Sequence, residues 1–278
     1  MKSFTILQFT ALISLLLLIA CEEDSISTID TKTPVVSSYL YAGQPLDSLH
    51  VSLSFSYARV DTNLITLDDL DITILASDQS FPLFNIGDGY YNNPELIVAD
   101  GQTYELSFDY EGETISSSTF VPEKREATIS STSLELEKIT NTGGFPGGGG
   151  FTEVDPIEIT WSNTENEYYY VLIENIEDNP EYVNDFLAEL EENFGRRFSL
   201  ITEPQITDFY SINPQREITQ FGTHRVIVFR VTPEYAALYE TSGTSSQSIT
   251  EPPSNIENGL GIFTGVSSDT LYFEVKQL

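Results

Sequence analysis

The sequence predicts a mostly β protein made of two antiparallel β-sandwich domains of the immunoglobulin or transthyretin-like kind. Stretches in which apolar and polar residues alternate recur along the chain, and turn-forming pairs such as Asp100-Gly101 separate them. This spacing of strands and turns is typical of a sandwich. We expect one sandwich at residues 34–122 and a second at residues 123–278, the second carrying one or two short helices.

Residues 1–20 are expected to form a lipoprotein signal peptide. The apolar run Ala11–Ala20 is about half as long as the roughly 20 residues that cross a bilayer as a helix, so it fits a secretory signal. It leads into Leu18-Ile19-Ala20-Cys21, which resembles the lipobox of bacterial lipoproteins. Cys21 is the only cysteine, so we expect it to carry the lipid and no disulfide to form. The alternative is an ordinary cleaved signal with an incidental cysteine.

Residues 21–33 are polar and show no periodicity, which is typical of a tether between a lipid and the first folded domain. The acids in Cys21-Glu22-Glu23-Asp24 resemble a stretch that directs lipoproteins to the cell surface in Bacteroidetes-type bacteria. We therefore expect a lipid-anchored outer-membrane protein exposed on the cell surface, with the periplasmic face as the alternative.

The strands of the first sandwich are predicted from alternation. Apolar side chains at every second position indicate half-buried strands. The clearest sets are Leu49, Val51, Leu53 and Phe55, and Tyr104, Leu106, Phe108 and Tyr110. Thr114–Val121 is the next strand, and Pro122 ends it.

The second sandwich shows the same alternation in Ile157, Ile159 and Trp161. We expect the lone tryptophan to anchor the core, with a ligand platform as the alternative. The glycine-rich run at residues 143–150 is expected to be a flexible loop, because it lacks the Lys-Ser/Thr pair of a phosphate-binding loop. Further strands are expected at Tyr168–Ile173, Arg225–Val231 and Leu271–Val275.

Two helices are expected in this second domain. Asn179 is placed to cap a helix at about residues 180–194, with Pro180 at its first position. Its apolar stripe would consist of Tyr182, Phe186, Leu190 and Phe194. A shorter helix is expected after Thr232, which can cap it, with Pro233 first inside.

The chain is strongly acidic, with a net charge of −31 from 43 acidic and 12 basic residues. Such a surface repels nucleic-acid phosphates, so no nucleic-acid partner is expected. Asp68-Asp69-Leu70-Asp71 lacks the spacing and glycine of a calcium loop and is interpreted as a solvated strand entry. His50 and His224 have no second ligand at metal-binding spacing. We therefore expect neither a metal nor a cofactor.

The segment Ser254-Asn255-Ile256-Glu257-Asn258-Gly259-Leu260-Gly261-Ile262-Phe263 resembles the SNIxxGLGxF signature of a Bacteroidetes lipoprotein family labelled "domain of unknown function forty-two forty-nine". The similarity extends to Pro34-Val35-Val36, Gly89-Tyr90-Tyr91 and Gly101-Gln102-Thr103-Tyr104-Glu105-Leu106. Genes of this family often lie beside those of TonB-dependent outer-membrane receptors. The resemblance therefore implies an accessory role at the outer membrane.

The signature supplies the candidate site residues, which are Asn255, Ile256, Gly259, Leu260, Gly261 and Phe263. The glycines permit backbone conformations that are closed to other residues, and the apolar members can pack inward between them. A structural role is the first interpretation. A binding loop carried on a rigid sandwich is the alternative.

Three functional hypotheses remain. The first is a non-enzymatic lipoprotein that acts as an accessory or ligand-capture partner of a TonB-dependent transport system. The second is a surface adhesin or glycan-binding module, whose aromatic platform would come from Tyr90, Tyr91 or Tyr168–Tyr170. The third is a hydrolase with two catalytic carboxylates, a pair that is defined by separation in space and not by sequence spacing.

Overall fold

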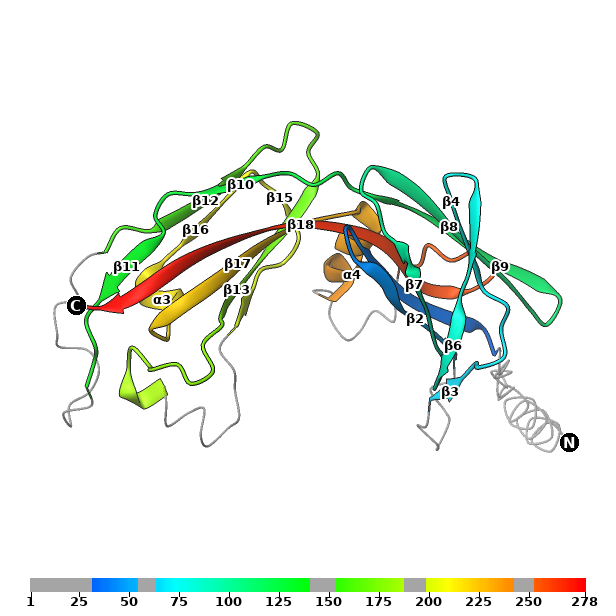
Figure 1. The fold of residues 1–278 in the computed structure, drawn as a ribbon, viewed down its shortest axis with the longest axis horizontal. Helices are drawn as coiled ribbons and strands as arrows, with labels where there is room; N and C mark the ends of the chain where they lie inside the picture. The colour runs from blue at the N-terminus through cyan, green and yellow to red at the C-terminus, as the bar shows by residue number, and fades with distance from the viewer. Residues whose placement is uncertain (1–31, 55–63, 141–153, 188–198, 243–252) are drawn as a thin grey trace, which may run out of the picture. The chain divides into compact units, whose positions relative to one another are not determined.

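The computed structural model describes residues 32–54, 64–140, 154–187, 199–242 and 253–278 (Figure 1). The expected signal peptide, the lipid-bearing Cys21, the glycine-rich run and residues 188–194 of the expected helix lie outside these ranges. Strands make up most of the described chain, which confirms the mostly β prediction.

The largest sheet has eleven strands, and its main path runs β14-β13-β17-β18-β1-β2-β7-β6, with β11, β15 and β3 attached beside it. Its strands are β1 (Pro34–Tyr41), β2 (Pro45–Leu53), β3 (Ile65–Thr66), β6 (Phe84–Gly87), β7 (Tyr90–Ile97), β11 (Ser133–Leu136), β13 (Tyr168–Asn175), β14 (Leu200–Ile201), β15 (Gln205–Ile206), β17 (Gly222–Val231) and β18 (Leu260–Gln277).

Two smaller sheets accompany it. The four-stranded sheet has the order β5-β4-β8-β9 and the three-stranded sheet the order β10-β12-β16. Their strands are β4 (Thr73–Ala76), β5 (Gln79–Pro82), β8 (Gln102–Tyr110), β9 (Glu113–Val121), β10 (Ala127–Ile129), β12 (Ile157–Trp161) and β16 (Phe209–Ile212). The helices with assigned bounds are α3 (Pro214–Glu217) and α4 (Pro233–Ser242).

Strand β18 is 18 residues long and is much longer than the strand expected at Leu271–Val275. Its first part pairs in parallel with β1, from Val35 opposite Leu260 to Tyr41 opposite Val266. Its second part pairs antiparallel with β17 and in parallel with β11. The expected antiparallel pairing thus gives way to parallel pairing at these two places. The last four residues of the family signature, residues 260–263, are therefore strand instead of loop.

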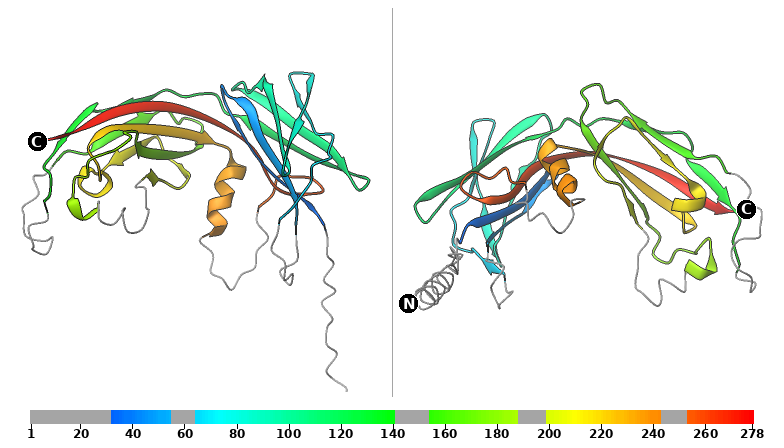
Figure 2. Two further views of the ribbon diagram at one scale, coloured as in Figure 1. Left: turned by 60° about the horizontal axis from the view of Figure 1, so that its bottom comes forward. Right: turned by 180° about the vertical axis from the view of Figure 1, so that it is seen from behind.

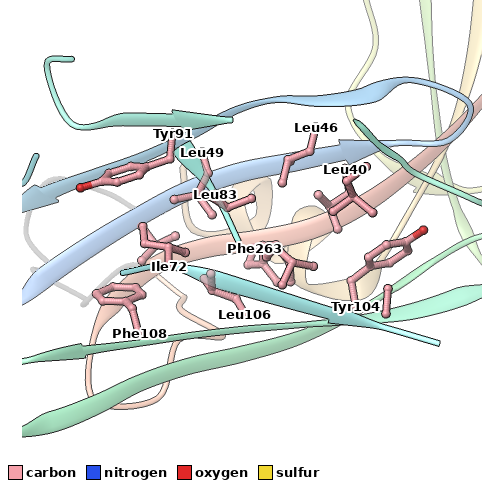
Figure 3. Close-up of a cluster of buried hydrophobic side chains, with 14 of the residues drawn as sticks. Leu40, Leu46, Leu49, Ile72, Leu83, Tyr91, Tyr104, Leu106, Phe108 and Phe263 are labelled. Carbon is pink, nitrogen blue, oxygen red and sulfur yellow. The ribbon is translucent and has the colours of Figure 1, made fainter. Parts of the chain in front are cut away.

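In the described ranges, buried side chains form two hydrophobic clusters. The first collects residues of β1, β2, β4, β7, β8 and β9 together with Ile256 and Phe263 (Figure 3). It therefore contains residues from both sides of the expected boundary at residue 122. The second cluster gathers around β12, β13 and β17, and Trp161 lies in it beside Tyr169, with 5.2 Å between the ring centres.

The helix expected at about residues 180–194 does not begin at Pro180. Tyr182 forms an isolated bridge with Gln220, and Asn184 forms one with Ile139. These long-range pairings take up the backbone that the local capping signals assign to a first helical turn. Helical structure starts at residue 185, where the Asn184 side chain accepts a hydrogen bond from the Phe186 N–H at 3.0 Å. Asn179 is therefore not the cap.

The predicted apolar stripe of this helix is also wrong over its described part, because Tyr182 is buried whereas Phe186 is exposed. The second expected helix is present as α4, which stands out from the large sheet near β18 (Figure 2). The Thr232 hydroxyl accepts a hydrogen bond from the Tyr235 N–H at 3.4 Å, as a cap should.

Candidate functional site

The signature segment, residues 254–263, is closed by the side chain of Asn255. Its amide nitrogen donates to the Phe263 carbonyl at 2.7 Å, and its amide oxygen accepts from the Phe263 N–H at 3.0 Å. The amide thus pairs with a buried strand residue in the way that a neighbouring backbone would. Both polar groups of the Asn255 side chain are used inside the fold.

Two apolar residues and the glycines of the signature segment are held by packing, whereas Leu260 is only half-buried and lies in neither cluster. Ile256 and Phe263 are buried in the first cluster. Gly261 has a φ of +105°, and a Cβ atom there would overlap the Val36 carbonyl of the paired strand. At Gly259 a Cβ atom would lie 2.8 Å from a methyl group of Ile256. Both positions therefore need glycine for close approach.

The signature segment also extends the four-stranded sheet at its β9 edge. Glu257 bridges Ser116 antiparallel, with the Glu257 N–H donating to the Ser116 carbonyl at 2.7 Å. The Ser117 hydroxyl donates to the Asn255 carbonyl at 2.7 Å, and the Asn258 amide donates to the Thr114 carbonyl at 2.9 Å. These bonds fix the segment against β9.

A hollow of about 590 Å³ lies beside this junction, which is within the size range of small-ligand sites, roughly 300–1,000 Å³. Its lining residues come from β4, β8, β9 and the signature segment: Thr73, Leu75, Glu105, Leu106, Ser107, Ser116, Ser117, Ser118, Asn255 and Glu257. We call it the signature hollow.

The floor of the signature hollow is the sheet face that points away from the first cluster. Strand register places Thr73, Ser107 and Ser116 in one row across β4, β8 and β9. Leu75, Glu105 and Ser118 form the adjacent row. The floor is therefore rich in hydroxyl groups, with an aliphatic side chain toward one edge.

Two carboxylates line the signature hollow. Glu257 is oriented by the Ser116 hydroxyl, which donates to its carboxylate at 3.0 Å. Glu105 lies in the neighbouring row, opposite Ser118. Glu105 and Glu257 are separated by two inter-strand spacings across the sheet and by two residues along the strand direction. The strand spacing therefore places their Cα atoms about 12 Å apart.

The aromatic side chains expected to form a platform are only partly accessible. Tyr91 is fully buried and its hydroxyl donates to the Leu67 carbonyl at 2.7 Å, and Tyr169 is buried in the second cluster. Tyr90 is 42% exposed and its ring lies 4.5 Å from that of His50. Tyr90 therefore stays available to a ligand, whereas Tyr91 and Tyr169 do not.

Tyr170 belongs to an aromatic cluster between the large sheet and α4. Its ring stacks on Phe229 at 4.5 Å and on Tyr235 at 5.6 Å. The hydroxyls of Tyr235 and Tyr239 lie 3.2 Å apart. Burial raises the pKa of Tyr170 to about 12 and raises that of Tyr235 as well. The hydroxyls of Tyr170 and Tyr235 are therefore neutral donors at physiological pH.

The two histidines lie in different settings. His224 is buried, its ring stacks on Phe273 at 5.0 Å, and burial lowers its pKa. His50 is paired with Tyr90 as described. Asp68, from the acidic run, accepts hydrogen bonds from the Gly89 N–H at 2.6 Å and the Asn85 amide at 3.2 Å, and the first of these lowers its pKa most. These hydrogen bonds show that Asp68 stabilises a turn.

In the part of the chain that the structure describes, no three His, Cys, Asp or Glu side chains gather where they could hold a metal ion. No described helix is both long and apolar enough to cross a membrane.

Sequence reasoning singled out the signature but missed the hydroxyl floor beside it. Thr73, Ser107, Ser116 and Ser118 occupy the solvent-facing positions of alternating strands, where polar residues are ordinary. The run Ser116-Ser117-Ser118 inside a predicted strand is the one signal that could have drawn attention to this face.

A sequence model of the protein family described as "Domain of unknown function (DUF4249)" matches residues 22–271 of the chain. No curated protein matches the chain.

Proposed function

Since the chain belongs to the DUF4249 family, we propose that it is a non-enzymatic outer-membrane lipoprotein that acts as an accessory or ligand-capture partner of a TonB-dependent transporter. The lipobox supports the anchor at Cys21. The partner class comes from the resemblance described above, in which genes of the family often lie beside those of TonB-dependent receptors.

The observation that carries ligand capture is the position of the signature segment. Ile256 and Phe263 are packed in the first cluster, whereas Glu257 and the neighbouring hydroxyls of β8 and β9 face the signature hollow. The segment that resembles the family signature thus builds one wall of a ligand-sized hollow. Loops and segments fixed on rigid sheets commonly carry recognition.

The test is a pull-down of the tagged full-length protein from native membranes after mild cross-linking. We expect a TonB-dependent receptor to co-purify, and a Cys21→Ser variant to lose both membrane association and the receptor. Recovery of the lipidated protein from membranes without any such receptor would contradict the proposal.

A glycan-binding module is the second candidate, because exposed tyrosines share one face of the large sheet. In the strand register Tyr90 lies opposite His50, and His50 lies opposite Ser37, so the three side chains are on the same face of the sheet. Tyr41 lies on the same side of β1 as Ser37, since side chains alternate along a strand. Tyr90 and Tyr41 are 42% and 44% exposed. A glycan array should detect binding that Tyr90→Ala and Tyr41→Ala both weaken, and a blank array would remove this candidate.

The hydrolase hypothesis ranks third. It requires two carboxyl groups about 5–9.5 Å apart, and the Cα separation of about 12 Å between Glu105 and Glu257 does not by itself establish such a pair. Release of reducing sugar from polysaccharide by the wild-type protein, with loss in Glu105→Gln, would promote this hypothesis over the first two.

A further inference from the structure

We infer that the signature hollow binds a short, extended peptide segment that carries two basic side chains, which pair with Glu105 and Glu257. The inference rests on the proposed ligand capture and names the chemistry of the captured group. Three features of the hollow carry it: its unmatched charge, its hydrogen-bonding floor and the spacing of its carboxylates.

The charge of the hollow is unmatched within the fold. Its lining contains two carboxylates and no Lys, Arg or His. Every ion pair that the structure describes uses other acids, and neither Glu105 nor Glu257 takes part in one. With 43 acidic and 12 basic residues in the chain, an anionic ligand would be repelled and a cationic one attracted.

The floor offers the partners that a peptide needs. The hydroxyls of Thr73, Ser107 and Ser118 can each donate and accept, so they can satisfy both the N–H and C=O groups of an extended backbone. Leu75 is 40% exposed at the edge of this floor. Its methyl groups can contact the aliphatic stem of a lysine or arginine, which such residues bury while the charged end stays polar.

The carboxylate spacing selects the spacing of the basic residues. The Cα atoms of Glu105 and Glu257 are about 12 Å apart, and residues i and i+4 of an extended strand are about 13 Å apart with side chains on the same face. A segment with basic residues four positions apart can therefore place one cation at each carboxylate. Two adjacent basic residues point to opposite faces and can engage only one of them.

The probe is the blocked pentapeptide Lys-Gly-Ser-Gly-Lys, titrated by calorimetry into the full-length lipidated protein in detergent. Its isomer Lys-Lys-Gly-Ser-Gly has the same charge and composition. We expect the first peptide to bind at least tenfold more tightly than the isomer, and its affinity to fall as salt is raised.

The double variant Glu105→Gln/Glu257→Gln should weaken binding of the first peptide at least tenfold. The amide oxygen that this variant introduces at position 257 can still accept from the Ser116 hydroxyl, so the fold is expected to persist, and an unchanged melting temperature checks this. The matched control is Glu135→Gln/Glu158→Gln, which removes two exposed glutamates on β11 and β12. This control should change the affinity less than twofold.

Equal weakening by the control pair would show that only the overall negative charge attracts the peptide, and the inference would fall. Equal binding of the two isomers, or displacement of the peptide by maltopentaose, would overturn it as well, the latter in favour of a glycan ligand. The two proposals can fail separately. If the peptide experiments overturn this inference, a receptor that still co-purifies with the Glu105→Gln/Glu257→Gln variant would leave the proposed function standing.

Discussion

Replacing Asn255 with alanine tests whether the signature is part of the fold. The variant removes two hydrogen bonds, at 2.7 and 3.0 Å, and leaves both backbone groups of Phe263 without their partner. Phe263 is fully buried, so each orphaned group costs roughly 1–3 kcal/mol. Partial entry of water reduces this cost, and we expect a total loss of about 2–4 kcal/mol in the free energy of unfolding.

Differential scanning calorimetry and urea denaturation measure this loss. A protein of this size should lose about 2–4 °C of Tm for each kcal/mol, so a fall of roughly 5–15 °C is expected. Asn258→Gly is the matched control, because Asn258 has a φ of +56° and makes one exposed bond to Thr114. The control should lie within about 0.5 kcal/mol of the wild type. A loss equally small in Asn255→Ala would refute the structural role of the amide.

Three further predictions concern packing, backbone and pH. Phe263→Ala should cost about 3–5 kcal/mol in unfolding free energy, whereas Tyr272→Ala in the exposed part of the same strand should cost less than about 1 kcal/mol; urea denaturation checks both. Gly261→Ala should cost more than about 3 kcal/mol, from backbone overlap and strain together, while Gly87→Ala, with a positive φ but open space around it, should cost about 1–2 kcal/mol. Burial lowers the pKa of His224 below its ordinary value of 6.5, so the unfolded chain binds this proton more readily. Stability should therefore decline as the pH falls below about 6.5, and His224→Gln should flatten that decline in Tm measured between about pH 5 and 7; an unchanged slope would contradict the assignment.

The alternating strands were predictable because alternation is a local signal. Leu49, Val51 and Leu53 are buried in β2, and the apolar positions of β8 face the first cluster, as period-two patterning requires. Helix α4 was predictable from Thr232 and Pro233 for the same reason.

The features that escaped prediction depend on distant partners. The glycines of the signature weaken any local strand signal, and only the pairing with β1 shows that β18 begins at Leu260. The bond between Ser117 and Asn255 spans 138 residues, so no local pattern could place the hydroxyl floor beside the signature. The local capping signals at Asn179 and Pro180 were likewise outweighed by backbone pairing with residues 219–221.

The seating of Phe263 in the first cluster has a consequence for the order of synthesis. A ribosome makes the chain from its N-terminus, so β1, β2, β8 and β9 are complete long before residue 263 exists. Until then the first cluster lacks two of its buried side chains, Ile256 and Phe263. The first cluster is therefore complete only when nearly the whole chain is present, and a protein that lacked β18 would have an unfinished core.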